Sequence, residues 1–163
     1  LALTRQKVPL IDRKVYASAE GLRRGGYILA EADGVRSPTV REGNGTDGSP
    51  TLILIATGSE VSLALDAREH LQKDGIATRV VSMPCTELFE EQPQDYRDEI
   101  LPPSITARLA IEAGVRQGWD RYVGPKGDVI CLDRFGASAP GDVAMKNLGF
   151  NVENVLTHAR RLV

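Results

Sequence analysis

The stretch from Thr51 to Lys73 constrains the fold more than any other part of this 163-residue chain. Leu52 to Ala56 are apolar without a break, which is typical of a strand covered on both faces in a mostly parallel sheet. From Val61 onwards apolar residues recur at helical spacing, and Gly75 ends that run. A second short strand pattern follows at 78–83. The stretch therefore predicts a strand–helix–strand unit.

Strand and helix signals continue to alternate on both sides of this unit. Further strands are predicted at 27–30, 105–111 and 128–132, and helical segments at 18–24, 87–100, 141–148 and 152–162. This alternation predicts an α/β fold of three layers, α/β/α, around a mostly parallel five-stranded mixed sheet. We expect strands 27–30 and 51–56 to pair as an antiparallel hairpin with a long loop, which gives the sheet one antiparallel edge strand.

The chain divides into a connector and one domain. Residues 1–14 contain Pro9 and a charged run, and we interpret them as the end of a preceding domain and an interdomain linker. Because the chain opens without methionine inside an apolar pattern, we expect it to be a piece of a longer polypeptide. Residues 15–163 then form the domain itself. Within it, 31–50 is rich in glycine and poor in large apolar residues, which predicts a mobile surface loop.

Composition excludes several classes of partner. A formal net charge of −2 and a pI near 5.7 argue against nucleic acid. No apolar run approaches the ~18 residues of a membrane span, and no secretory signal is visible, so we expect no membrane partner and a cytoplasmic setting. The two cysteines, Cys85 and Cys131, have neither metal-ligand spacing nor a disulfide framework. We expect both to be buried, reduced thiols.

The turn Thr57-Gly58-Ser59 carries the most distinctive local chemistry. Thr57 and Glu60 have the spacing of a capping box, in which each side chain reaches the other's backbone N–H. The free N–H groups of a helix start also form a generic anion site, although the dinucleotide and P-loop fingerprints are missing. We interpret the turn as a helix cap and keep the anion site as the alternative. The turn at Gly136–Pro140, with Ser138 as candidate cap, is interpreted in the same way.

Other polar residues have ordinary explanations. His70 and His158 lack a partner at a telling spacing, so we expect both at the surface. Glu112 and the pair Asp133-Arg134 follow strands and could line a crevice at the strand carboxyl ends, but an internal or intersubunit ion pair is the simpler role.

Aromatic and basic residues complete the set of candidates. Trp119 and Tyr122 are interpreted as packing or interface residues. Arg5 has a planar fork suited to phosphate or carboxylate, yet its position alone indicates a solvated linker charge. No nucleophile–base pair, metal cluster or carboxylate dyad emerges, so the residues predict no complete active site.

Short stretches spread over nearly the whole chain resemble, in order, the C-terminal domain of transketolase. The stretches are Leu3–Gln6, Arg24–Tyr27, Ala56–Val61, Val81–Pro84, Leu101-Pro102, Ala110–Gly114, Trp119, Tyr122–Gly124, Phe135–Pro140, Gly149-Phe150 and Asn154-Val155. Thr57–Val61 is shared with related thiamine-diphosphate enzymes, whereas Thr4-Arg5-Gln6 and Gly136–Pro140 are more specific to transketolase. The 31–50 loop is longer than the family's usual tight hairpin.

The resemblance implies a homodimeric enzyme that moves a two-carbon ketol unit between sugar phosphates in the pentose phosphate pathway. It implies thiamine diphosphate and a divalent ion, Mg²⁺ or Ca²⁺, both held by two earlier domains, so no cofactor, metal or catalytic residue is carried over to this chain. The implied partners are those domains, a second subunit and the sugar-phosphate substrate. Arg5 matches the arginine that binds the substrate phosphate in the family. The resemblance therefore implies a substrate-binding role for Arg5 instead of a solvated linker charge.

For the fragment itself, the resemblance implies a structural, dimer-forming domain that is inactive alone. Two alternatives remain. One is a regulatory module that binds an anion or nucleotide at the helix start near Ser59. The other is the C-terminal domain of a different thiamine-diphosphate enzyme.

Overall fold

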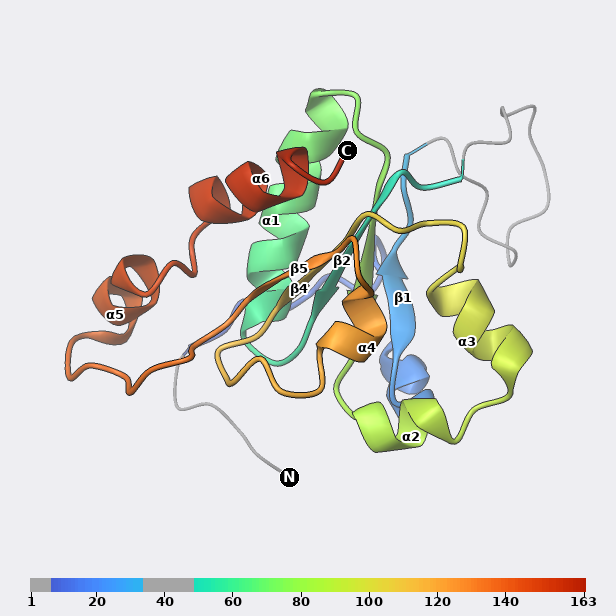
Figure 1. Ribbon diagram of the computed structural model, residues 1–163, viewed down its shortest axis with the longest axis horizontal. Coiled ribbons are helices and arrows are strands. Elements are labelled where there is room, and N and C mark those ends of the chain that lie inside the picture. The colour runs from blue at the N-terminus through green and yellow to red at the C-terminus, as the bar shows by residue number, and fades with distance from the viewer. Residues whose placement is uncertain (1–6, 34–48) are drawn as a thin grey trace.

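The computed structural model describes residues 7–33 and 49–163 and builds them into one five-stranded sheet with helices around it (Figure 1). Arg5 and most of the 31–50 loop lie outside the described residues. The strands are β1 (Tyr27–Ala30), β2 (Leu52–Ala56), β3 (Thr78–Ser82), β4 (Arg108–Ile111) and β5 (Asp128–Ile130). The helices are the 3₁₀ helix η1 (Ala19–Arg24), α1 (Glu60–Lys73), α2 (Thr86–Glu90), α3 (Gln94–Ile100), α4 (Asp120–Val123), α5 (Gly141–Asn147) and α6 (Val152–Arg160).

The strand order is β1-β3-β2-β4-β5. β2, β3, β4 and β5 run parallel, and β1 pairs antiparallel with β3 at the edge, with Tyr27 opposite Ser82. The predicted mixed sheet with one antiparallel edge strand is confirmed. The predicted hairpin between β1 and β2 is wrong, because β2 lies at the centre of the sheet with β3 on one edge and β4 on the other. β1 therefore pairs with the outer edge of β3 instead.

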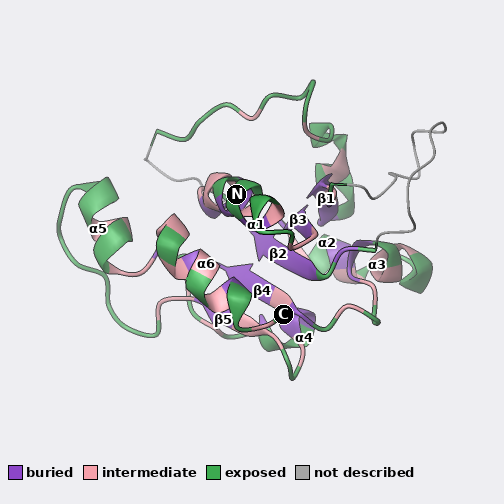
Figure 2. Ribbon diagram, turned by 90° about the horizontal axis from the view of Figure 1, so that it is seen from above, coloured by how far each residue is buried: buried purple, intermediate pink, exposed green. Residues whose placement is uncertain are grey.

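Each face of the sheet has its own core, which confirms the three layers. Leu52, Leu54 and Ala56 of β2 face a cluster under α1 and α6. Ile53 and Ile55 face a second cluster that includes residues of α2, α3 and α4. All five side chains are inaccessible to solvent, so alternate residues of one strand fill both cores, as the unbroken apolar run predicts. Figure 2 shows the buried sheet between helices whose outer faces are exposed.

Helix boundaries follow caps and prolines. Ser18 accepts the Glu20 N–H at 3.2 Å and Asn151 accepts the Asn154 N–H at 2.9 Å, so these two residues cap η1 and α6. Ser138 caps no helix, since Pro140 takes the N-cap position of α5 without a side-chain hydrogen bond. The helix predicted over 87–100 is two helices, α2 and α3, because Pro93 interrupts it and occupies the position before α3.

Two arginines, the buried Arg79 and the half-buried Arg108, connect neighbouring elements by hydrogen bonds. Arg79 on β3, which is 6% exposed, pairs with Glu31 after β1 at 2.8 Å. It also donates to the carbonyl oxygens of Glu99 and Ile100 at the end of α3, at 2.7 and 3.0 Å. Arg108 on β4 donates to carbonyl oxygens on the 101–105 segment and to that of Tyr122 on α4. These guanidinium groups supply the donors that buried carbonyl oxygens need.

Within the described residues, no helix is both long enough and apolar enough to cross a membrane.

Candidate functional site

The carboxyl ends of β2 and β4 are the place where an open sheet of this strand order binds ligands in other proteins, and we call this place the crevice. The chain leaves β2 towards β3 on one side and returns to β4 on the other side. Such a change of direction is the topological switch point, where open α/β sheets bind ligands. The turn 57–59 follows β2, and Glu112 follows β4. Gly58 has φ of +52°, a left-handed conformation that suits glycine and lets the strand turn sharply into α1.

A hydrogen-bonded set of hydroxyls and carboxylates lines this crevice. The Thr57 hydroxyl donates to Glu112 Oε2 at 2.7 Å, and the Ser59 hydroxyl donates to Glu60 Oε1 at 2.6 Å. The capping box predicted for Thr57 and Glu60 is wrong, because each side chain is engaged elsewhere. Only a backbone bond remains between the two residues, from the Glu60 N–H to the Thr57 carbonyl at 3.1 Å.

Glu60 is a buried carboxyl group with 4% of its surface exposed. Burial is the main cause that raises its pKa above the ordinary value, and the charge of Glu112 adds to this effect. The Ser59 hydroxyl and the Ala113 N–H, which lies 3.5 Å from Glu60 Oε2, oppose the shift. Two carboxylates therefore flank the start of α1. Their charge disfavours an anion there, which argues against a phosphate site at Ser59.

The Asp133-Arg134 pair lies beyond the end of β5, and both residues are exposed. Asp133 Oδ1 accepts the Arg116 N–H at 3.4 Å. Within the described part of the chain, neither residue forms an internal ion pair, and the predicted intersubunit pair stays a prediction. A shallow pocket of about 340 Å³ lies against them, with Cys131, Leu132, Asn147 and Leu148 in its wall.

Both cysteines are free thiols but are half-buried rather than buried. Burial, followed by the nearby Asp133 carboxylate, raises the pKa of Cys131.

The two histidines differ. His70 is exposed, as predicted. The surface prediction for His158 is wrong: it is half-buried, and its Nδ1 lies 2.7 Å from Asp128 Oδ2. Burial alone would raise the pKa of Asp128, but His158, the Val129 N–H and Arg116 together lower it below the ordinary value. The partners are 30 positions apart, so no local spacing could reveal the pair before α6 was placed beside β5.

Trp119 and Tyr122 are packing residues, as predicted. Both are buried, and their rings meet edge-to-face with centroids 5.9 Å apart. Burial, followed by the neighbouring Glu90 carboxylate, raises the pKa of Tyr122 to about 12. The phenol ring lies inside the layer formed by α2, α3 and α4.

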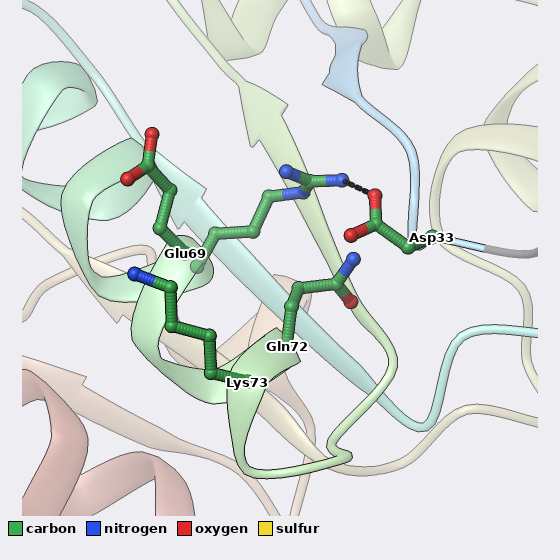
Figure 3. Close-up of a pocket in the computed structure, with 5 residues that line it drawn as sticks. Asp33, Glu69, Gln72 and Lys73 are labelled. Carbon is green, nitrogen blue, oxygen red and sulfur yellow. Dashed lines mark hydrogen bonds and ion pairs between the residues drawn. The ribbon is translucent and has the colours of Figure 1, made fainter.

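Two further pockets lie away from the crevice. One of about 530 Å³ runs along the outer edge of β1, between residues 15–18 and α3. The other, of about 280 Å³, lies beside the second half of α1 (Figure 3). There Arg68 reaches Asp33 at 2.8 Å and Gln72 points towards the pair, whereas Glu69 and Lys73 point away (Figure 3). Because this pocket is lined by both acidic and basic side chains, it does not indicate one class of ligand.

No group of three or more His, Cys, Asp or Glu side chains is placed to hold a metal ion within residues 7–33 and 49–163. The crevice carboxylates Glu60 and Glu112 are already engaged by hydroxyl and N–H donors. The described residues therefore do not fit a diphosphate held through a divalent cation, which needs free oxygen ligands.

The fold and the crevice define an α/β domain of the doubly wound type, with an antiparallel edge strand and no assembled catalytic group among its described residues. The chain matches the family "Transketolase-like TK C-terminal domain" over residues 25–151. It belongs to that family.

Relatives in sequence and in structure agree with this assignment. The chain is 52% identical over 155 residues to a transketolase of Aquifex aeolicus, covering 95% of this chain and 20% of that protein. It is 45% identical over 163 residues to a transketolase of Geobacillus stearothermophilus, covering 100% of this chain and 22% of that one. The chain thus spans about a fifth of the length of these relatives.

Solved transketolases have the same fold. The enzyme from Leishmania mexicana superposes with a TM-score of 0.73 at 37% identity, over 90% of this chain and 19% of that chain. A Pichia stipitis transketolase in complex with sedoheptulose-7-phosphate superposes with a TM-score of 0.77 at 32% identity, over 97% of this chain and 20% of that chain.

Proposed function

We propose that this chain serves as the C-terminal domain of an enzyme that transfers a two-carbon ketol unit between sugar phosphates in the pentose phosphate pathway. The observation that carries the proposal is the identity of 45–52% to transketolases over almost the entire chain. The same identity favours transketolase over other thiamine-diphosphate enzymes. Complexes of the Pichia stipitis relative with xylulose-5-phosphate and sedoheptulose-7-phosphate support sugar phosphates as the substrate class.

Within such an enzyme, the proposed role of this domain is structural. Its partners are the remaining domains of the polypeptide and a second subunit of a homodimer, and the proposed compartment is the cytoplasm. Residues 1–14 form the connector and 15–163 the domain; the exposure of most of residues 7–14 supports this division. Thiamine diphosphate with Mg²⁺ or Ca²⁺ would supply the ketol-transfer chemistry from the other domains, so the fragment is inactive alone.

Arg5 is the residue of this chain that we propose to touch the substrate. A guanidinium group forms charge-assisted, often bidentate hydrogen bonds with phosphate. Each such bond contributes about 1.5–3 kcal/mol, which corresponds to roughly 10- to 100-fold in affinity. The substrate phosphate is remote from the reacting carbonyl, so this contact acts on substrate binding.

The test is Arg5→Ala in the full-length enzyme. We expect KM for phosphorylated sugars to rise roughly 10- to 100-fold, while KM for unphosphorylated sugars changes little. Lys7→Ala is the matched control, because it removes an exposed cation from the same connector. Equal effects of Arg5→Ala on both sugar classes would remove the phosphate role. Absence of ketol transfer by the unsubstituted full-length protein would instead refute the proposed activity.

A further inference from the structure

An ion pair joins the last helix of the domain to the outermost parallel strand. His158 lies in the last turn of α6, and its Nδ1 is 2.7 Å from Oδ2 of Asp128, the first residue of β5. The two side chains are 26% and 37% exposed, so both are partly withdrawn from water. In the sheet, β5 pairs with β4 and ends the strand order. The pair therefore links a helix at the end of the chain to a strand at the edge of the sheet.

The other contacts of α6 do not change with pH in the physiological range. Val155 and Ala159 are inaccessible to solvent and pack into the cluster that holds apolar residues of α1 and β4. Arg160 forms an exposed ion pair with Asp74 at the end of α1, at 2.6 Å. Arginine and aspartate ordinarily keep their charges between pH 5.5 and 8. His158 is thus the contact of α6 whose charge can change in this range.

The surroundings of His158 favour a positively charged ring. The Asp128 carboxylate lies directly against Nδ1. The ring also lies at the carboxyl end of α6, where the helix dipole attracts a cation. Both influences act on the protonated ring and not on the neutral one, so uptake of a proton strengthens the pair.

Three arginines nearby carry charge of the opposing sign of effect, and none is the nearest partner of Asp128. Arg116, in the loop after β4, lies 3.8 Å from Asp128 but 2.9 Å from Asp120 on α4. Arg160 is engaged by its own carboxylate at the end of α1. Arg161 is exposed, so water and salt screen its charge. Asp128 Oδ2 is therefore left to the imidazole ring.

Asp128 stays charged over the range in which a histidine titrates. Burial favours its neutral form, but the hydrogen bonds from His158 and the Val129 N–H, together with the charge of Arg116, lower its pKa below the ordinary value. On the same strand, burial raises the pKa of the Cys131 thiol, which keeps this neighbour neutral. The charge state of the pair is thus decided by the imidazole ring alone.

We propose that His158 and Asp128 form a pH-sensitive clip, which fastens α6 to β5 most firmly when the imidazole ring is protonated. Histidine has an ordinary pKa of about 6.5, so a fall from pH 8 to pH 5.5 charges the ring. The charged ring forms a charge-assisted hydrogen bond with the carboxylate, whereas the neutral ring offers a weaker donor. Acidification therefore suppresses local opening of α6, and a rise in pH promotes it.

The test is amide hydrogen exchange of α6 in the full-length protein, read by mass spectrometry at pH 5.5 and pH 8. Rates are converted to protection factors, which report local opening once the intrinsic effect of pH on exchange is removed. His158→Gln keeps a neutral hydrogen-bond donor and removes the charge. We expect protection of α6 in the wild type to exceed that in His158→Gln by about 3- to 10-fold at pH 5.5 and by less than about 2-fold at pH 8.

Asp128→Asn tests the same pair from the strand. It should lower protection of α6 at pH 5.5 to the level seen in His158→Gln. His70→Gln, at the exposed histidine of α1, is the matched control and should leave protection of α6 unchanged at both pH values. All these variants retain Glu60, so its own titration cancels from the comparisons.

Two results would overturn the clip. One is a ratio of wild type to His158→Gln that is the same at both pH values. The other is wild-type protection of α6 in Asp128→Asn at pH 5.5, which would assign the effect to the helix end alone. None of these measurements depends on ketol transfer, so the clip and the proposed activity are tested separately.

Discussion

At the residue scale, the crevice at β2 and β4 shows which contacts a sequence can and cannot specify. The strand-to-helix turn at 57–59 was predictable, because a buried apolar run ends there and a helical pattern begins. The partners of Thr57 were not predictable. Glu112 lies 55 positions away, and its carboxylate reaches Thr57 only because β4 pairs with β2. A hydroxyl bonded to a carboxylate replaced the expected cap, since a charged acceptor forms the stronger hydrogen bond.

The buried Glu60 makes a prediction about pH. Its folded-state pKa is raised above the ordinary 4.5, mainly by burial, so the folded chain binds the proton more tightly than the unfolded chain does. Its stabilising contribution is complete below the unfolded pKa and is lost as the pH rises through the folded pKa. Glu60→Gln removes this titration. We therefore expect the free energy of unfolding of the wild type, relative to Glu60→Gln, to fall as the pH rises from 4 towards 7.

Urea unfolding of the chain at stepped pH measures this difference. Glu69→Gln, an exposed position on the same helix, is the matched control, because its carboxylate stays in water. A difference between wild type and Glu60→Gln that is independent of pH would contradict the inference that burial disfavours the Glu60 charge.

At the element scale, strand positions followed from local pattern, but strand neighbours did not. All five predicted strands exist, since short apolar runs between turns have few other stable arrangements. The prediction of a β1–β2 hairpin was wrong because neighbours in sequence need not be neighbours in the sheet. The fully apolar strand β2 occupies the centre of the sheet and pairs with β3 and β4. β2 is buried on both faces and both edges, so β1 is left at the edge of β3.

The edge where β1 meets β3 depends on Arg79. Its guanidinium neutralises Glu31 and satisfies two carbonyl oxygens at the end of α3. Arg79→Met leaves a buried carboxylate without a counter-charge, and removing one partner of a buried pair costs about 3–5 kcal/mol. We expect a loss of that size in the free energy of unfolding of the chain, measured with urea.

Two comparisons separate the effect of the lost ion pair from the effect of altered side-chain packing at Arg79. The double variant Arg79→Met with Glu31→Gln should recover part of the loss, because the unpaired charge is gone. Arg160→Met breaks the exposed ion pair between Arg160 and Asp74, in which the two side chains are 52% and 43% exposed. This substitution should lower the free energy of unfolding by less than about 1 kcal/mol. Equal losses at the two arginines would show that burial of the Arg79 pair is irrelevant.

At the scale of the whole molecule, the described part of the chain is organised around its five-stranded sheet. Two cores, one on each face of the sheet, give it a complete interior. The carboxylates of its crevice are occupied by neighbouring hydroxyl and N–H donors. The fold and family were predictable because motifs along most of the chain agree. The exposure of Phe135 was not predictable, since it is a property of the assembled domain and not of its sequence.

The proposed structural role of this domain predicts that the cofactor binds to the other domains of the enzyme. A ligand that binds only the folded state stabilises it by RT ln(1 + [L]/Kd), about 2.7 kcal/mol at 100 times Kd. Thiamine diphosphate with Mg²⁺ should therefore raise the melting temperature of the full-length enzyme by several degrees. It should leave that of the 163-residue chain unchanged, because the proposed binding groups lie on other domains. Thermal unfolding monitored by circular dichroism measures both. A saturable rise in the chain alone, lost in Glu112→Gln, would move cofactor contacts into this crevice and refute the structural role.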